Sequence, residues 1–158
     1  MSKLHQYQSE IVWTGNLGTG TSSYKDYERS YTISSPQKPV ILGSSDPMFR
    51  GEASKYNPED LLLSSLSACH MLWYLHFCSD KKIIVEEYKD NATATMQLDP
   101  NGSGKFIEAT LHPVIKIKSA ANIQLAHDLH EQAHKFCFIA NSLNFDVSIK
   151  PTITSSEV

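Results

Sequence analysis

Three cysteines, Cys69, Cys78 and Cys137, carry the strongest potential for chemistry in this 158-residue chain. A cysteine thiolate is a nucleophile that oxidants attack, whereas a neutral thiol in an apolar core is inert. An odd number of cysteines at wide spacing does not make the disulfide framework of a small secreted protein. We therefore expect a cytoplasmic protein in which each cysteine is structural, metal-binding or reactive.

Cys69 is the first candidate nucleophile, and it falls well inside a predicted helix. Leu66 and Trp73 lie about one turn away on the same side of that helix. Composition alone favours a small core side chain, because free cysteine is among the most buried residue types. A thiol in mid-helix gains nothing from the positive end of the helix dipole. If Cys69 is reactive, a neighbouring cation must stabilise its thiolate.

Arg50 is the best-placed cation in the sequence. The chain has only two arginines, Arg29 and Arg50, and Arg50 stands in the loop shortly before the helix. A guanidinium stays charged, and its planar fork can hold a thiolate and a peroxide oxygen together. Glu59, in the first helical turn, is a candidate to hold that fork. Taken alone, Arg50 also fits a solvated loop residue and Glu59 an ordinary helix-dipole acid.

The other two cysteines differ in their expected roles. Cys78 follows Cys69 by nine residues, which places it near the opposite side of the helix. A disulfide between these two is excluded while the helix persists, so Cys78 is expected to be structural. Cys137 follows a second predicted helix, where it is either a packed core cysteine or a partner for Cys69.

Histidines form a rival constellation on the second predicted helix. His127, His130 and His134 share one helical face, at spacings that can hold zinc or copper. A solvated or interface face is the more usual explanation of such a pattern. His70 points about 100° away from Cys69 around the first helix, so it is not expected to act as a base for that thiol.

The first half of the chain must position these residues through strands, a loop and a helix. Residues 5–14 and 24–34 have the composition of strands, and residues 35–56 form a long loop with room for a short strand at 40–42. Asn57, Pro58 and the two acids that follow predict a helix start. The helix is expected to run to about Ser79 and, being apolar nearly all round, to be buried on most sides.

The second half predicts a hairpin, a helix and a last strand. Residues 84–98 and 105–118 alternate and are joined by a turn-rich loop at 99–104. A helix begins after Asn122 with a buried stripe, which consists of Ile123, Ala126, Leu129, Ala133 and Phe136. Residues 145–153 form the last strand. The expected order is β-β-(β)-α-β-β-α-β, an α+β fold in a single domain over residues 1–158.

Composition excludes several classes of function. Apolar residues make up 41% of the chain, and the net charge is -3 without any basic block, so no nucleic-acid binding is expected. Residues 61–78 are the only candidate membrane span. Five of these eighteen residues are serine or histidine, so a buried helix and no membrane association are expected. The polar first ten residues have no apolar signal core.

The residues from Asn57 to Cys69 resemble the signature of a known family. Asn57-Pro58-Glu59-Asp60-Leu61 followed by Ser67-Ala68-Cys69 is similar to the NPE-[QED]-L…AC pattern of the OsmC/Ohr family. This family comprises the osmotically inducible protein C and organic hydroperoxide resistance proteins. A second cysteine after another helix, Cys137, matches in order and approximate distance, and the resemblance covers nearly the whole chain.

The resemblance implies a fold and a reaction. The OsmC-like fold is an intertwined homodimer in which strands of both chains wrap two central helices, with active sites at the interface. Cys69 would reduce an organic hydroperoxide and Cys137 would resolve the sulfenic acid as a disulfide. Glu59 would hold the activating arginine, for which Arg50 matches the OsmC-type placement and Arg29 is the weaker candidate. A dithiol such as a lipoyl group would restore the thiols, and no metal or other cofactor is implied.

Two departures from the family pattern concern the substrate. His70 stands where many members have Phe, and Phe138 stands where many have Pro, which favours a subfamily closer to OsmC than to Ohr. Phe49, Leu66 and Trp73 are expected to line an apolar pocket for an organic hydroperoxide. The alternative is a non-catalytic protein of the same fold that binds a small hydrophobic ligand while both cysteines stay inert.

Overall fold

The computed structural model describes residues 3–157, and contacts divide the chain into two compact units. The first unit ends at Leu61 and the second begins at Leu62, inside a continuous helix. Each unit has its own sheet structure. The single domain expected over residues 1–158 therefore stays a prediction.

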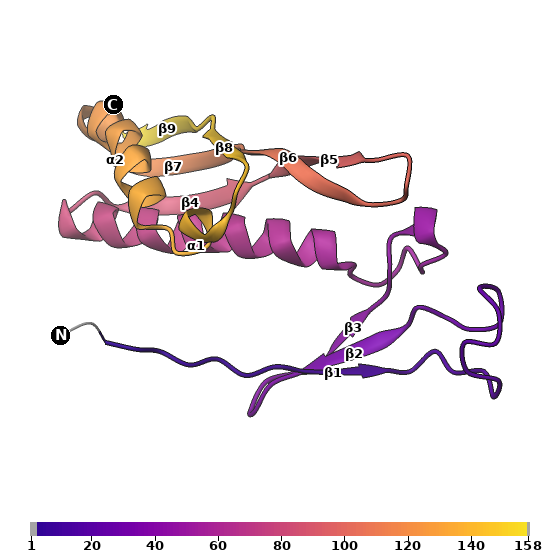
Figure 1. Ribbon diagram of the computed structural model, residues 1–158. Helices are drawn as coiled ribbons and strands as arrows, with labels where there is room; N and C mark the ends of the chain where they lie inside the picture. Colours follow the sequence, from indigo (N-terminus) through magenta and orange to yellow (C-terminus); the bar gives the residue numbers. More distant parts are fainter. Residues whose placement is uncertain (1–2, 158) are drawn as a thin grey trace. The chain divides into compact units, whose positions relative to one another are not determined.

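The first unit is built on one antiparallel sheet of three short strands (Figure 1). They are β1 (Glu10–Trp13), β2 (Tyr31–Ser34) and β3 (Ile41–Gly43), in the order β1-β2-β3. The two long strands predicted over 5–14 and 24–34 are thus much shorter. The intervening residues fold instead as a loop in which the Asn16 side chain accepts hydrogen bonds from the backbone N–H groups of Gly18 and Gly20.

The long helix α1 (Pro58–Asp80) confirms the helix predicted from its start signals. The Asn57 side chain accepts a hydrogen bond from the Asp60 N–H at 2.7 Å, which satisfies one of the free donors of the first turn. The helix ends where Lys82 adopts a left-handed conformation, φ 59°, and the Ile83 N–H returns to the Cys78 carbonyl.

Burial of α1 is less complete than predicted, because the second unit buries only one side of it. The buried residues are Leu66, His70, Tyr74, Phe77 and Cys78. On the other side Leu72 is 62% exposed. By length and composition alone α1 would also pass as a membrane span, which for one helix is weak evidence, since the core helix of a soluble protein passes the same test.

Two three-stranded sheets complete the second unit. Its strands are β4 (Val85–Asp90), β5 (Thr93–Leu98), β6 (Gly104–Leu111), β7 (Pro113–Ser119), β8 (Asp146–Ile149) and β9 (Thr152–Glu157). Their orders are β4-β7-β9 and β5-β6-β8, with β9 and β8 running parallel to their neighbours. In Figure 1, α1 runs alongside these strands.

Each segment predicted as one strand in this half is two strands. The break after Asp90 faces the break at His112, where the Asp90 carboxylate accepts a hydrogen bond from the His112 N–H at 2.7 Å. Pro151, which lacks an N–H donor, separates β8 from β9. The predicted hairpin is therefore β5–β6, and β4 pairs with β7 outside it.

Helix α2 (Ile123–Phe136) packs one face into the core of the second unit. Ala126, Leu129 and Ala133 are buried as predicted, but Phe136 is 47% exposed and His130 is buried instead. Asn122 precedes the helix as expected, although its side chain makes no capping hydrogen bond. The molecule is thus α+β, the predicted class, with more strands than the sequence indicated.

Candidate active site

Cys69 and Cys137 lie together in the second unit. Cys69 packs against a buried apolar cluster that contains Leu66, Ala109, Leu111 and Cys137. The two cysteines therefore belong to the same packed cluster, and neither is in a disulfide. Helix α1 supplies Cys69, and Cys137 is the residue that ends α2. The fold therefore joins two cysteines that are 68 positions apart in the sequence.

Cys137 is the inaccessible member of the pair. Its side chain has no exposed surface, and this burial, with the contact to the Cys69 thiol, raises the pKa of Cys137 to about 11. Backbone N–H groups of Ala140 and Ile139 oppose that shift, and the Ala140 N–H approaches the sulfur at 3.4 Å. At neutral pH Cys137 is consequently a protonated thiol.

Cys69 is half-buried and opens onto a groove of about 370 Å³. The groove is lined by Cys69, Leu72, Trp73, His76 and Phe138. Phe138 meets the Trp73 ring edge-on, with 5.5 Å between the ring centroids. Because Cys137 is covered and Cys69 is not, a molecule in this groove meets the sulfur of Cys69 first.

The three residues predicted to bind substrate are distributed differently. Trp73 lines the groove, whereas Leu66 is only 1% exposed and packs in the core. Phe49 belongs to the first unit, at the end of a short 3₁₀ turn. Sequence reasoning missed His76 and Phe138 as groove residues. His76 follows Cys69 by seven positions, a spacing that could have placed it on the same helical face.

Arg50 and Glu59, both in the first unit, do not form an ion pair among the described residues. Arg50 ends the 3₁₀ turn with φ 66° and is exposed, and its guanidinium lies 5.9 Å from the centre of the Tyr24 ring. One carboxylate oxygen of Glu59 is buried and has no hydrogen-bond partner within residues 3–157. Its charge adds to the burial that raises the pKa of Tyr31. A buried carboxylate oxygen without a donor is a place where a cation would be stabilised.

Arg29 is more firmly held than Arg50. Its guanidinium donates to the backbone carbonyls of Tyr24 and Tyr27 and lies over both tyrosine rings, at 4.3 and 4.0 Å from their centres. These contacts keep its donors occupied by its own loop. Arg50 is therefore the arginine whose head group is free to take another partner.

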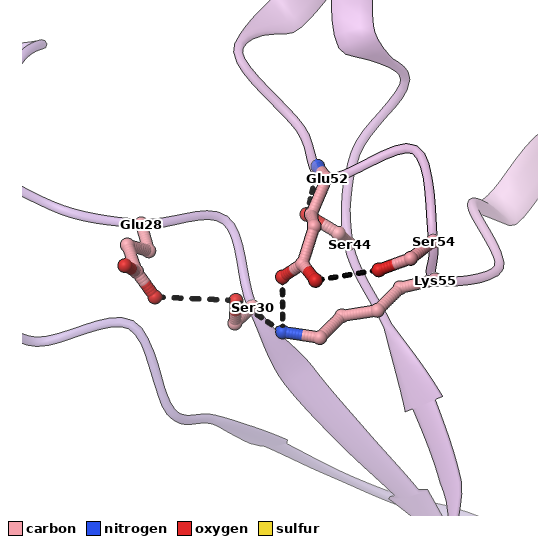
Figure 2. A network of polar contacts seen from close by, with 6 residues as sticks. All are labelled: Glu28, Ser30, Ser44, Glu52, Ser54 and Lys55. Atoms are coloured by element: carbon pink, nitrogen blue, oxygen red, sulfur yellow. Dashed lines mark hydrogen bonds and ion pairs between the residues drawn. The ribbon is translucent and has the colours of Figure 1, made fainter.

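Lys55, the other cation near this loop, is also occupied (Figure 2). Its ammonium lies 2.6 Å from the Glu52 carboxylate and 3.0 Å from the hydroxyl of Ser30, the residue directly before β2. The Glu52 N–H in turn donates to the hydroxyl of Ser44 at 3.1 Å. The network ties the loop that carries Arg50 back onto the sheet and leaves Lys55 with partners of its own.

The histidine face expected on α2 is contradicted by its middle member, His130, which is buried. His130 is 4% exposed, and its Nδ1 lies 2.9 Å from Nε2 of His70, itself 1% exposed. No group of three or more His, Cys, Asp or Glu side chains arranged to hold a metal ion occurs between residues 3 and 157. Burial is the main cause that lowers the pKa of His70 to about 4 and that of His130 to about 3.

This pair should make the protein less stable in acid. Because both histidines have a pKa near 6.5 when unfolded and a lower pKa when folded, the unfolded chain binds more protons below pH 6.5. Stability is then complete above pH 6.5 and falls as the pH drops towards 4. Between pH 7 and 5 each histidine should cost roughly 2 kcal/mol in the free energy of unfolding.

Urea unfolding of the protein at the two pH values measures this loss. His127→Gln, which replaces an exposed histidine of the same helix, is the control and should keep the pH dependence. His130→Asn should remove a large part of it. An unfolding free energy that is the same at pH 5 and pH 7 would contradict the neutral buried pair.

Comparison with known proteins identifies relatives of the chain. Residues 51–152 match the family model described as OsmC-like protein. This match includes Glu59, Cys69 and Cys137, whereas Arg29 and Arg50 lie before it. No curated protein matches the chain.

Solved structures share the fold at low sequence identity. An OsmC-like protein of unknown function from Vibrio cholerae superposes with a TM-score of 0.84 at 24% identity, over 94% of this chain and 100% of that one. An organic hydroperoxide resistance protein from Elizabethkingia anophelis gives 0.70 at 21%, over 99% and 100%. An organic hydroperoxide resistance protein from Legionella pneumophila gives 0.67 at 18%, over 97% and 99%. Likeness at these identities establishes the fold.

Proposed function

Because the chain belongs to the OsmC-like family, we propose that it is a cytoplasmic thiol peroxidase that reduces organic hydroperoxides to alcohols in defence against oxidative stress. Cys69 is the attacking thiol and Cys137 the resolving thiol. The observation that carries the proposal is their proximity: Cys69, which lines an apolar groove, packs against the buried cluster that contains the covered Cys137. Structural neighbours named as organic hydroperoxide resistance proteins support the same class of substrate.

The first step oxidises Cys69. Its thiolate attacks the terminal oxygen of the hydroperoxide, an S–O bond forms and the O–O bond breaks. The alkoxide takes a proton and leaves as the alcohol, while Cys69 has lost two electrons and become a sulfenic acid. A guanidinium beside the sulfur stabilises both the thiolate and the negative charge that develops on the leaving oxygen.

The second step uses the neighbouring thiol. Cys137 attacks the sulfenic sulfur, a disulfide forms and water leaves. The contact with Cys69 gives Cys137 a short path to that sulfur, and its high pKa keeps it from reacting with the peroxide itself. A dithiol, such as a lipoyl group, then reduces the disulfide by thiol–disulfide exchange, which restores both cysteine thiols and leaves the dithiol as a disulfide.

The arginine in this proposal comes from a second copy of the chain. Glu59 and Cys69 are ten residues apart on one continuous helix, a rise of about 15 Å. One guanidinium cannot contact both groups across that distance. Arg50, held by Glu59 of its own chain, therefore serves Cys69 of the partner in a homodimer. The exposed side of α1 around Leu72 gives such a partner an apolar surface to cover.

Mass spectrometry after one equivalent of cumene hydroperoxide tests the proposal. We expect one alcohol per chain and a Cys69–Cys137 crosslinked peptide, because the two sulfurs already lie within reach. A sample kept without peroxide is the control. The absence of that crosslink, or a crosslink that includes Cys78, would contradict the assignment of the resolving thiol.

Substrate preference follows from the apolar walls of the groove. Cumene hydroperoxide should have a higher kcat/KM than hydrogen peroxide, since its ring buries apolar surface against Leu72, Trp73 and Phe138. Phe138→Ala removes one exposed wall and should lower this preference about fivefold. Equal efficiencies of the two peroxides with the unaltered protein would contradict a role of the groove in substrate binding.

A further inference from the structure

Two buried histidines link the helices that carry the two cysteines. His70 follows Cys69 directly on α1, and His130 lies seven residues, two turns, before Cys137 on α2. The Nε2 of His70 and the Nδ1 of His130 are 2.9 Å apart, and their rings are nearly parallel, at 9°. The reaction proposed above uses neither histidine, yet their hydrogen bond and the cysteine contact join the same two helices.

The pair is isolated from other hydrogen-bonding groups. The outer nitrogens, Nδ1 of His70 and Nε2 of His130, are buried and have no partner within residues 3–157. The Tyr74 ring lies parallel to that of His130 with centroids 4.0 Å apart, and so covers one face. With no competing partner, the mutual hydrogen bond is the polar contact that fixes both rings, and losing it would leave buried groups unsatisfied.

The hydrogen bond depends on protonation. One ring must offer an N–H and the other a lone pair, so two neutral rings or one shared proton can keep the bond, and two protons break it. Charged groups around the pair act in opposite directions. Asp90, from β4, favours a proton on His70, whereas His134 and His127, from α2, disfavour protons on the pair. The ring of Tyr88, also from β4, lies 5.9 Å from the ring of Tyr74, measured between centroids.

We propose that His70 and His130 are positioning residues, whose hydrogen bond holds α2 on α1 and thereby keeps Cys137 within reach of Cys69. The inference rests on the proposed function in taking the Cys69–Cys137 disulfide as the product that this arrangement favours. His70 stands on α1 directly after Cys69. Its hydrogen-bond partner, His130, stands on α2, so the bond connects the two helices.

Equilibration with reduced and oxidised dithiothreitol measures how readily Cys69 and Cys137 form a disulfide, without any peroxide. In this exchange two protein thiols are oxidised to a disulfide while oxidised dithiothreitol is reduced to its dithiol, so electrons and protons balance. His130→Leu removes the hydrogen bond at similar volume. The double variant His70→Gln with His130→Asn keeps an amide donor and acceptor at the two nitrogen positions and no longer titrates. Ile117→Val, in the same core but on β7, controls for lost stability.

The equilibrium constant for the Cys69–Cys137 disulfide should fall about tenfold in His130→Leu, by the loss of one buried hydrogen bond. It should stay near that of the unaltered protein in the double variant and in Ile117→Val. An unchanged constant in His130→Leu, or an equal loss in the double variant, would overturn the proposal.

The same experiment separates this proposal from the peroxidase. If the unaltered protein forms the disulfide with dithiothreitol but does not reduce hydroperoxides, the proposed function fails and the positioning role stands. If it reduces hydroperoxides and His130→Leu forms the disulfide equally well, the positioning role fails and the function stands. A protein that forms no Cys69–Cys137 disulfide under either oxidant would overturn both.

Discussion

Replacing Cys69 by serine should abolish the reduction of organic hydroperoxides, with a loss of roughly 1,000-fold or more in turnover. A serine hydroxyl is not ionised at neutral pH and cannot store two electrons as a sulfenic acid. Cys137 cannot take over, because it has no exposed surface and its pKa is raised to about 11. The rate of cumene hydroperoxide consumption with excess dithiol is the measurement.

Cys78→Ser is the matched control for this loss. Cys78 is on the same helix and is 1% exposed, but it packs in the other core cluster of the second unit, which also contains Tyr74. The variant should lose some stability and keep its turnover. Activity that survives Cys69→Ser, or that disappears in a folded Cys78→Ser protein, would exclude Cys69 as the nucleophile.

The features that the sequence predicted well are set by residues close together along the chain. The start of α1 is set by Asn57, Pro58 and Asp60, all within one turn, and the structure begins the helix at Pro58. Cys78 was placed away from Cys69 by helical rotation alone, and it does lie in a different core cluster. Features of this kind depend on neighbours along the chain, so the pattern contains the information.

The strands were harder because their partners are distant. Residues 24–30 have strand-like composition, yet the residues that pair with strands on both sides are Tyr31, Thr32 and Ile33. The break at His112 depends on Asp90, which receives a hydrogen bond from the backbone N–H of His112 across 22 residues. Composition indicates which residues tolerate a strand, but the pairing that ends a strand comes from the rest of the fold.

In the candidate site, too, neighbours along one helix were predicted, whereas contacts between distant residues were not. Spacing along α1 placed Trp73 near Cys69, and both line the groove. The same reasoning placed Leu66 there, but helical spacing does not distinguish the groove side from the core side of a half-buried residue. The burial of His130 could not be read from α2 at all, because its partner His70 is 60 residues away. The proximity of Cys137 to Cys69 was suggested by the family resemblance and not by either residue.

Replacing Cys137 by serine should stop the protein after a single oxidation. The groove, Cys69 and the arginine are unchanged by this substitution, so the first hydroperoxide is reduced at close to the normal rate. Without a resolving thiol, the sulfenic acid of Cys69 stays, and further peroxide converts it to sulfinic and sulfonic acids. We therefore expect a burst of one alcohol per chain followed by a stall.

Rapid-mixing measurements of alcohol release, with mass spectrometry of Cys69, show whether the burst and the overoxidised sulfur occur. Cys78 cannot resolve the intermediate, since it is buried in a separate cluster on the same helix, and a disulfide to it would require the helix to unwind. Continued turnover of Cys137→Ser on a dithiol would mean that the reductant attacks the sulfenic acid directly. The covered thiol beneath the groove would then be a packing residue, and its contact with Cys69 would have no part in the cycle.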